Sequence, residues 1–160
     1  MSIFSDVIGK EQCIGSHTFT AEEIIAFAAK FDPQPFHLDA EAAKKSVFGG
    51  LCASGWHTTA VFMKLNVVSM TQTVKDCLKR GETPPTFGPS PGFENLKWPK
   101  PVYAGDTITY WRTVHAVRPL ASRPGWSMLT MTTRACNQNG EEVLSFENAG
   151  MVKLPPETGS

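Results

Sequence analysis

Six consecutive residues, Asp32-Pro-Gln-Pro-Phe-His37, place a carboxylate and an imidazole at the two ends of a proline-containing segment. Adding water to a double bond conjugated with a carbonyl needs one group that takes a proton from water and another that delivers a proton to the α-carbon. Asp32 and His37 can divide these tasks, and the two prolines hold them at a fixed separation. The segment therefore predicts acid–base chemistry on a water molecule.

The same reaction needs a group that stabilises the enolate oxygen. Ser54 and Gly55 stand at the start of an apolar stretch that has helical character. A helix N-terminus presents unpaired N–H groups and a partial positive charge, and glycine lets a ligand carbonyl approach the backbone closely. We therefore expect Gly55, with Ser54 beside it, to provide an oxyanion site that needs no metal.

Structural roles compete with these catalytic ones. An Asp that precedes a proline is commonly a turn residue, and an isolated His is commonly a surface or core residue. The glycines at 49, 50 and 55 could simply permit a tight turn against a sheet. Spacing alone leaves both interpretations open.

The elements around the motif can be predicted in outline. Thr20-Ala-Glu-Glu23 is a capping box, so a helix begins at Thr20 and ends before Pro33. We expect residues 32–37 to form a stiff, non-helical loop and Asp39 to cap a short helix that ends at Lys45. A third helix, from Ser54 to Val68, has almost no polar face, which is typical of a helix buried in the middle of a fold.

The second half of the sequence is typical of strands. Runs rich in β-branched and aromatic residues, bounded by turn signals, predict strands over 93–98, 107–117, 126–137 and 142–154, with Asn139-Gly140 as a hairpin turn and 81–92 as a loop. The expected fold is α+β: one domain over 1–154, with an antiparallel sheet wrapped around a central apolar helix, which is the hot-dog arrangement. The tail 155–160 is expected to be disordered, and an open sheet edge predicts a homodimer.

Composition excludes several classes of protein. The 15 basic and 15 acidic residues cancel, so we expect neither a nucleic-acid footprint nor a membrane-binding basic patch. No apolar run is as long as the stretch of about 20 residues that a membrane-spanning helix needs. The N-terminus does not look like a signal peptide. The four cysteines have no zinc-site spacing, which indicates reduced thiols and no bound metal. Together with the lack of a membrane-spanning run, this predicts a soluble cytoplasmic protein.

The block Phe31 to Asp39, followed by Ala42-Ala43, Phe48-Gly-Gly-Leu and Ala53-Ser-Gly-Trp-His-Thr58, resembles the MaoC-like dehydratases, including the (R)-specific enoyl-CoA hydratases. The resemblance continues through Pro101 to Ile108 into the last strands. It implies a hot-dog homodimer that reversibly hydrates a 2-enoyl thioester in fatty acid metabolism, without a cofactor, because the coenzyme A moiety belongs to the substrate. It also implies that Asp32 and His37 hold the catalytic water and that the Gly55 N–H faces the thioester oxygen.

Departures from the common family pattern concern the substrate more than the chemistry. Gln34 replaces the more usual Asn, Phe36 replaces a small aliphatic residue, and Ser54-Gly55 replaces His-Gly. Gln34, Phe36, Trp56 and His57 are candidate pocket residues, although we favour a hydrogen-bonded structural role for His57. The 66–92 segment, longer than in the shortest hydratases of this type, could cover the acyl end of the substrate.

Other polar residues are weaker candidates. His17 and His115 fall in expected strands with no motif nearby, and Asp39 fits a helix cap better than a second base. Four arginines in the strand region could meet coenzyme A phosphates, although solvated strand faces explain them equally well: Arg112, Arg118, Arg123 and Arg134.

Two rival functions remain open. A hot-dog thioesterase commonly uses an acidic residue on the central helix, but no Asp or Glu occurs between Glu41 and Asp76. A non-catalytic acyl-thioester-binding protein would have no need of Asp32 and His37, and both are present. Within the hydratase class, a branched or dicarboxylic acyl chain is as compatible with the sequence as a straight one.

Overall fold

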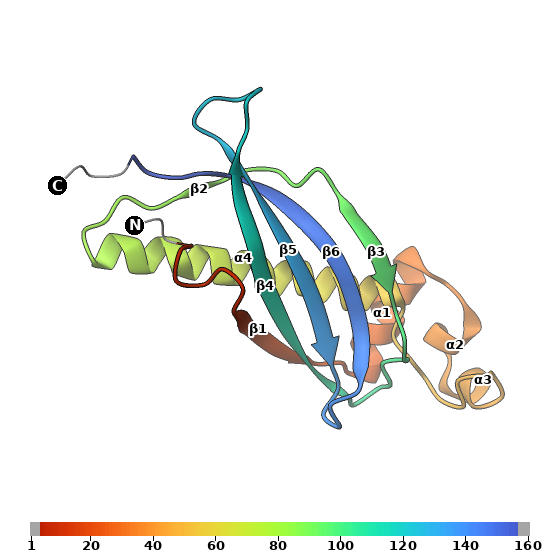
Figure 1. The fold of residues 1–160 in the computed structure, drawn as a ribbon. Coiled ribbons are helices and arrows are strands. Elements are labelled where there is room, and N and C mark those ends of the chain that lie inside the picture. Colours follow the sequence, from red (N-terminus) through yellow and green to blue (C-terminus); the bar gives the residue numbers. More distant parts are fainter. Residues whose placement is uncertain (1–3, 157–160) are drawn as a thin grey trace.

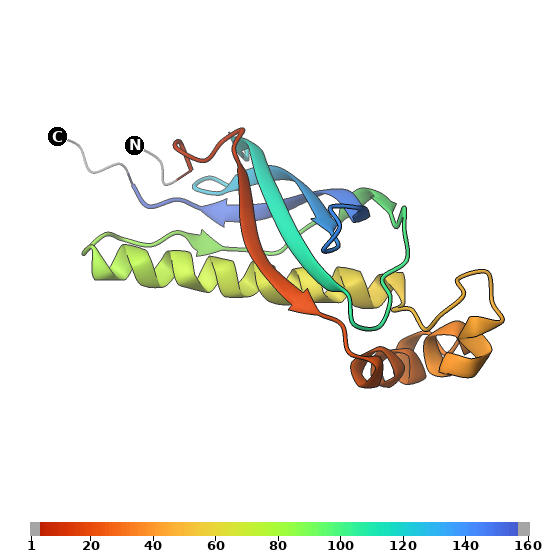
Figure 2. The same cartoon turned by 90° about the horizontal axis from the view of Figure 1, so that it is seen from below.

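One long helix, α4 (Gly55–Lys79), runs along a curled antiparallel sheet in the computed structural model, which describes residues 4–156 (Figures 1 and 2). The other helices are α1 (Ala21–Phe31), α2 (Pro35–Leu38) and α3 (Ala40–Lys44). The strands are β1 (Glu11–Thr18), β2 (Thr86–Phe87), β3 (Phe93–Lys97), β4 (Thr107–Pro119), β5 (Ser127–Cys136) and β6 (Glu142–Lys153). This is the hot-dog arrangement that the sequence predicts.

The sheet is built on the meander β4–β5–β6, and its strand order is β1-β4-β5-β6-β2. β3 also pairs with β6, so β2 and β3 follow one another along the same side of that strand. The β5–β6 turn contains Gly140 with a φ of 75°, a conformation that favours glycine and confirms the predicted hairpin. The sheet therefore has β1 at one edge and β2 with β3 at the other.

The core lies between α4 and the face of the sheet that it covers. Phe62 of α4 packs edge-on against Phe146 of β6, with ring centroids 4.9 Å apart. Tyr110 of β4 is fully buried, and its hydroxyl donates a 2.8 Å hydrogen bond to the carbonyl oxygen of Thr58. This bond fixes the first turns of α4 relative to β4, and with them the candidate oxyanion site.

The three short helices gather at the end of the molecule where α4 begins, as Figure 2 shows. Thr20 caps α1, and the reciprocal contacts with Glu23 complete the predicted capping box. Asp39 caps α3 by accepting from the N–H groups of Glu41 and Ala42, which confirms its predicted role. The segment that joins α1 to α3 is thereby held next to the N-terminus of α4.

Several sequence expectations need correction. The 32–37 loop is not free of helix, because Pro35 occupies the first position of α2, where a fixed φ and a missing N–H cost nothing. The third helix does not end at Val68 but continues to Lys79, since no breaker occurs before Gly81, which has a φ of 72°. The sequence predicts a strand at His17 but not the bounds of β1, and the short β2 interrupts the predicted 81–92 loop.

The third helix is also not buried all round. The sheet covers only one of its sides, so Trp56, Met63 and Val68 are 50%, 51% and 59% exposed. The exposed apolar side leaves room for a partner or a ligand.

Three further expectations concern the limits of the chain. Pro155 and Pro156 have no regular structure, and the rest of the predicted disordered tail lies outside the described residues. No helix within residues 4–156 combines the length and hydropathy that a membrane crossing needs. The assignment of residues 1–154 to one domain stays a prediction.

Candidate active site

Asp32 and His37 are brought together by the break between α1 and α2. Asp32 is the C-cap of α1, and His37 lies in the single turn of α2. His37 Nε2 is 3.4 Å from Asp32 Oδ2, and the two side chains are only 7% and 17% exposed. The largely buried imidazole and carboxylate therefore face one another across the break between α1 and α2.

The other nitrogen of the His37 ring is held by the backbone. Nδ1 lies 2.6 Å from the carbonyl oxygen of Cys52, which can only accept a hydrogen bond, so Nδ1 carries the proton. In the neutral ring, Nε2 then has the lone pair and points toward Asp32. Cys52 is itself fixed by a bridge to Tyr103. This orienting contact has no signal in the sequence, because it is made by a backbone atom 15 residues further along.

Polar neighbours keep Asp32 ionised. Its burial raises the pKa of the carboxyl, but hydrogen bonds with Ser54 and Gln34 and the proximity of His37 outweigh this, so that the pKa lies below its usual value. The Gln34 amide donates to Asp32 Oδ1 at 2.7 Å. Gln34 thus acts on the carboxylate and does not line the large cavity described below.

The Cys52 thiol also lies within the site. Its sulfur is 3.7 Å from His37 Nδ1, and burial, followed by the negative charge of Asp32, raises the pKa of the thiol to about 11. The thiol therefore stays protonated at neutral pH and is a poor nucleophile.

The N-terminus of α4 lies beside the pair, since Ser54 contacts Asp32 and caps the helix. The Ser54 hydroxyl accepts from the N–H of Trp56 at 3.3 Å. Among the described residues, no acceptor is found for the Gly55 N–H. That N–H is one of the unpaired donors of the helix end and is available to a ligand oxygen.

Trp98, which the sequence analysis did not single out, packs directly on Gly55. A Cβ built on Gly55 would lie 2.3 Å from Trp98 Cδ2, closer than any real contact. The indole also donates to the Thr59 hydroxyl at 3.2 Å. Glycine is therefore required here for packing as well as for any approach of a substrate. No sequence signal connects the two positions, because they meet only through the fold.

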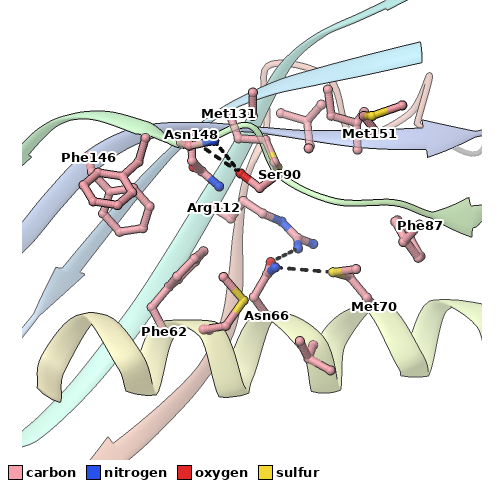
Figure 3. Close-up of a pocket in the computed structure, with 18 of the residues that line it drawn as sticks. Phe62, Asn66, Met70, Phe87, Ser90, Arg112, Met131, Phe146, Asn148 and Met151 are labelled. Carbon is pink, nitrogen blue, oxygen red and sulfur yellow. Dashed lines mark hydrogen bonds between the residues drawn. The ribbon is translucent and has the colours of Figure 1, made fainter. Parts of the chain in front are cut away.

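A cavity of about 510 Å³ runs between α4 and the sheet (Figure 3). Neither Asp32 nor His37 lines it, and on α4 its lining begins at Trp56, two residues beyond Ser54. The walls are mainly apolar, with Phe62 and Met63 on the helix and Phe146 on the sheet. The segment 66–92 adds Asn66, Val67, Met70, Thr73, Phe87, Gly88, Ser90 and Gly92. The volume is within the range of ligand pockets.

Two of the other candidate pocket residues lie elsewhere. Phe36 packs against His37 and Phe48, which supports the imidazole from outside. His57 is buried and stacks on Phe27, with ring centroids 4.6 Å apart. The expected hydrogen bond of its Nδ1 is not found among the described residues, and burial lowers the pKa of the ring. Trp56 is the candidate that reaches the large cavity.

The lesser candidates have local partners. His17 bonds Glu23 at 2.7 Å, and His115 bonds Thr132 at 2.8 Å, both from strands as predicted. Arg134 pairs with Glu11 and lies over the Trp111 ring. Arg118 and Arg123 are exposed, whereas Arg112 enters the cavity. Within residues 4–156, no group of three or more His, Cys, Asp or Glu residues could hold a metal ion.

The fold and the site together define a hot-dog protein with a paired Asp and His at the end of its central helix. A family model described as the MaoC like domain matches residues 5–121. The chain therefore belongs to the MaoC-like domain family.

Comparisons with individual proteins agree with this assignment. The structure is similar to that of a MaoC-like dehydratase from Rhodospirillum rubrum, with 36% identity, a TM-score of 0.79 and coverage of 98% of this chain and 99% of that one. It is also similar to the (R)-hydratase from A. caviae involved in PHA biosynthesis, with 27% identity, a TM-score of 0.63 and coverage of 92% and 96%. Among curated proteins, YdeM of Bacillus subtilis (strain 168), described as uncharacterized, is 27% identical over 132 residues, which are 82% of this chain and 84% of that protein.

Proposed function

We propose that this protein reversibly hydrates a 2-enoyl thioester, or in the reverse direction dehydrates a 3-hydroxyacyl thioester, most simply of coenzyme A. One observation carries the proposal: His37 Nε2 and Asp32 Oδ2 converge at 3.4 Å beside a helix end whose first N–H has no acceptor within residues 4–156. The similarity to a MaoC-like dehydratase and to an (R)-hydratase supports the reaction class.

The protonation states of His37 and Asp32 suit this reaction. Because Nδ1 donates to Cys52, both Nε2 and the ionised Asp32 can accept hydrogen bonds from one water molecule. As the water oxygen bonds to the β-carbon, Nε2 takes one of its protons while Asp32 holds the other O–H and stabilises the imidazolium, and the electron pair of the double bond moves toward the thioester oxygen. That oxygen accepts from the Gly55 N–H, and the imidazolium returns the proton to the α-carbon. Atoms and charges balance without a cofactor, since coenzyme A enters only as part of the substrate.

The thioesterase alternative has less support. Such an enzyme would need an acidic group aimed at the thioester carbonyl from α4, but the first carboxylate of that helix is Asp76, near its far end. The cavity lining contains no acidic residue among those described. The non-catalytic alternative leaves unexplained why Asp32 is kept ionised opposite a His of fixed tautomer.

We also propose that the chain forms a homodimer through the β3 edge. Phe93 on that strand is 51% exposed, and Trp56 and Trp98, which are 50% and 40% exposed, lie beside it. Three half-exposed aromatic rings next to an open strand form a surface that association would bury. Light scattering coupled to size-exclusion chromatography should report a dimer, and Phe93→Lys should shift it toward monomer.

The reaction can be tested with the wild-type protein and a series of 2-enoyl-CoA thioesters. Loss of the enoyl absorbance should be observed while free coenzyme A, measured in the same sample with a thiol reagent, stays constant. Thiol release that keeps pace with the loss of thioester would instead identify a thioesterase. Binding of the thioesters without either change would support the non-catalytic alternative.

A further inference from the structure

Arg112 places a positive charge inside the cavity between α4 and the sheet. It projects from β4 toward α4, with its guanidinium next to Asn66 (Figure 3). Of the described residues that line this cavity, Arg112 alone is charged. A cation in an otherwise apolar or neutral cavity is costly unless an anion or a full set of hydrogen bonds accompanies it.

The hydrogen bonds of Arg112 are incomplete. One terminal nitrogen donates to Asn66 Oδ1 at 2.6 Å, and the other reaches the Ser69 hydroxyl at a long 3.5 Å. Nε is buried and has no partner among the described residues. A guanidinium has five N–H donors, so most of its capacity is unused, and both partners that it does have are neutral.

The missing component is a negative charge. Burial lowers the pKa of the Arg112 guanidinium, and no acidic group in the described chain offsets this effect. By contrast, Arg134 on the neighbouring strand has a bidentate carboxylate partner in Glu11, with two contacts of 2.6 Å. Arg112 thus provides a cation with no charged partner among the described residues. The cavity provides the space for a carboxylate supplied by a ligand.

The position of Arg112 along α4 indicates which part of a substrate it would meet. Asn66, its partner, lies 11 residues beyond Gly55 in the same helix, which corresponds to about 16 Å along the axis. An acyl chain that enters this cavity at Trp56, the residue after Gly55, would pass the apolar walls at Phe62 and Phe146 before it reached Arg112. The cation therefore stands at the distal part of the acyl path.

We propose that Arg112 binds a carboxylate at the far end of the acyl chain, so that the preferred substrates are 2-enoyl thioesters with a terminal carboxylate. The proposal rests on the hydration reaction proposed above and narrows its substrate class. Phosphates of coenzyme A fit this site less well, because they carry several negative charges and the cavity offers one cation within apolar walls.

The test compares three acyl-CoA series of equal length: chains that end in a carboxylate, their methyl esters, and chains that end in a methyl group. Chain lengths of roughly eight to fourteen carbons bracket the distance set by the helix rise. Wild-type protein should hydrate the carboxylates with a kcat/KM about tenfold to a hundredfold above that of the esters, the scale of a charge-assisted hydrogen bond. Equal kcat/KM values for acids and esters would overturn the proposal.

Two variants and a control locate the effect. Arg112→Met should abolish the discrimination by lowering kcat/KM for the carboxylates to that of the methyl esters, and Arg112→Lys should retain part of the discrimination. Arg118→Met, which removes an exposed arginine from the same strand, should behave like wild type. Discrimination that survives in Arg112→Met would overturn the proposal, as would an equal loss of activity on all three series, which indicates a purely structural arginine.

Binding calorimetry tests the Arg112 site independently of the hydration reaction. A saturated carboxyacyl-CoA cannot be hydrated, yet it should bind wild-type protein at least tenfold more tightly than its methyl ester, and Arg112→Lys should reduce that ratio even if Arg112→Met fails to fold. If carboxylates bind preferentially but no enoyl thioester is hydrated, the proposed function fails and the Arg112 site stands. If methyl-terminated enoyl thioesters are hydrated and carboxylates gain nothing, the Arg112 site fails alone.

Discussion

Adding a methyl group at Gly55 separates its packing role from its proposed oxyanion role. In Gly55→Ala the new Cβ would lie 2.3, 2.4 and 2.7 Å from Cδ2, Cε2 and Cε3 of Trp98, so the indole must move. Trp98 is 40% exposed and can do so, but it then loses its hydrogen bond to Thr59. The backbone is no obstacle, because Gly55 is the first residue of a helix.

Three contributions determine how far Gly55→Ala changes the free energy of unfolding. Overpacking costs about 1–3 kcal/mol, and the lost hydrogen bond costs about 1 kcal/mol. Replacing glycine by alanine in a helix returns about 0.5–1 kcal/mol. The free energy of unfolding of Gly55→Ala should therefore fall by about 1–3.5 kcal/mol. In a Trp98→Ala background the obstruction is gone, and the same change should instead stabilise the protein by about 0.5–1 kcal/mol.

Urea unfolding and enoyl-CoA hydration are measured for four proteins: wild type, Gly55→Ala, Trp98→Ala and the double variant. Stability should recover in the double variant, but activity should not, since the methyl group still obstructs approach to the Gly55 N–H. Losing such a donor costs about 10²–10³-fold in rate. If the double variant is as active as Trp98→Ala alone, Gly55 is required only to accommodate the indole, and the oxyanion assignment is refuted.

Two further predictions concern the surroundings of the pair. Gln34→Leu removes an amide that lowers the pKa of Asp32, so that the carboxylate should be protonated at a higher pH and the acid limb of the pH–kcat/KM profile should move to higher pH; an unmoved limb would contradict the assigned contact. Thr20→Ala removes the cap of α1 and should lower the free energy of unfolding by about 1 kcal/mol in urea titrations, whereas Thr20→Ser, which keeps the hydroxyl, should not.

Local patterns in the sequence predicted the elements with strong signals. The capping box at Thr20, the cap at Asp39 and the hairpin at Gly140 are all confirmed, because each depends on residues only a few positions apart. The sequence predicts a strand at His17 but not its bounds, because the exposed side of β1 and Gly15 weaken the apolar alternation, and β1 is specified by pairing with β4 about a hundred residues later. The apolar pattern of the third helix stops at Val68, so it does not predict the polar second half of α4.

The candidate site also has a part that local sequence patterns predict and a part that depends on the fold. The spacing of Asp32 and His37 predicted that they would meet, since two prolines within six residues restrict the chain. The contacts that orient them come from afar: Cys52 supplies a backbone oxygen, which leaves no trace in residue type. Trp98 over Gly55 and Arg112 beside Asn66 are likewise products of the fold, since each joins residues more than 40 positions apart.

The most direct test of the central claim is the rate of enoyl-CoA hydration by Asp32→Asn and His37→Gln, measured against wild type with one thioester. Asp76→Asn and His115→Gln, which change the same residue types away from the site, are the matched controls. Each site variant should be slower by about 10²-fold or more, the scale of general acid–base catalysis, while thermal unfolding shows that it is folded and the controls keep wild-type rates. Full activity in both folded site variants would contradict the assignment of Asp32 and His37 as the acid–base pair.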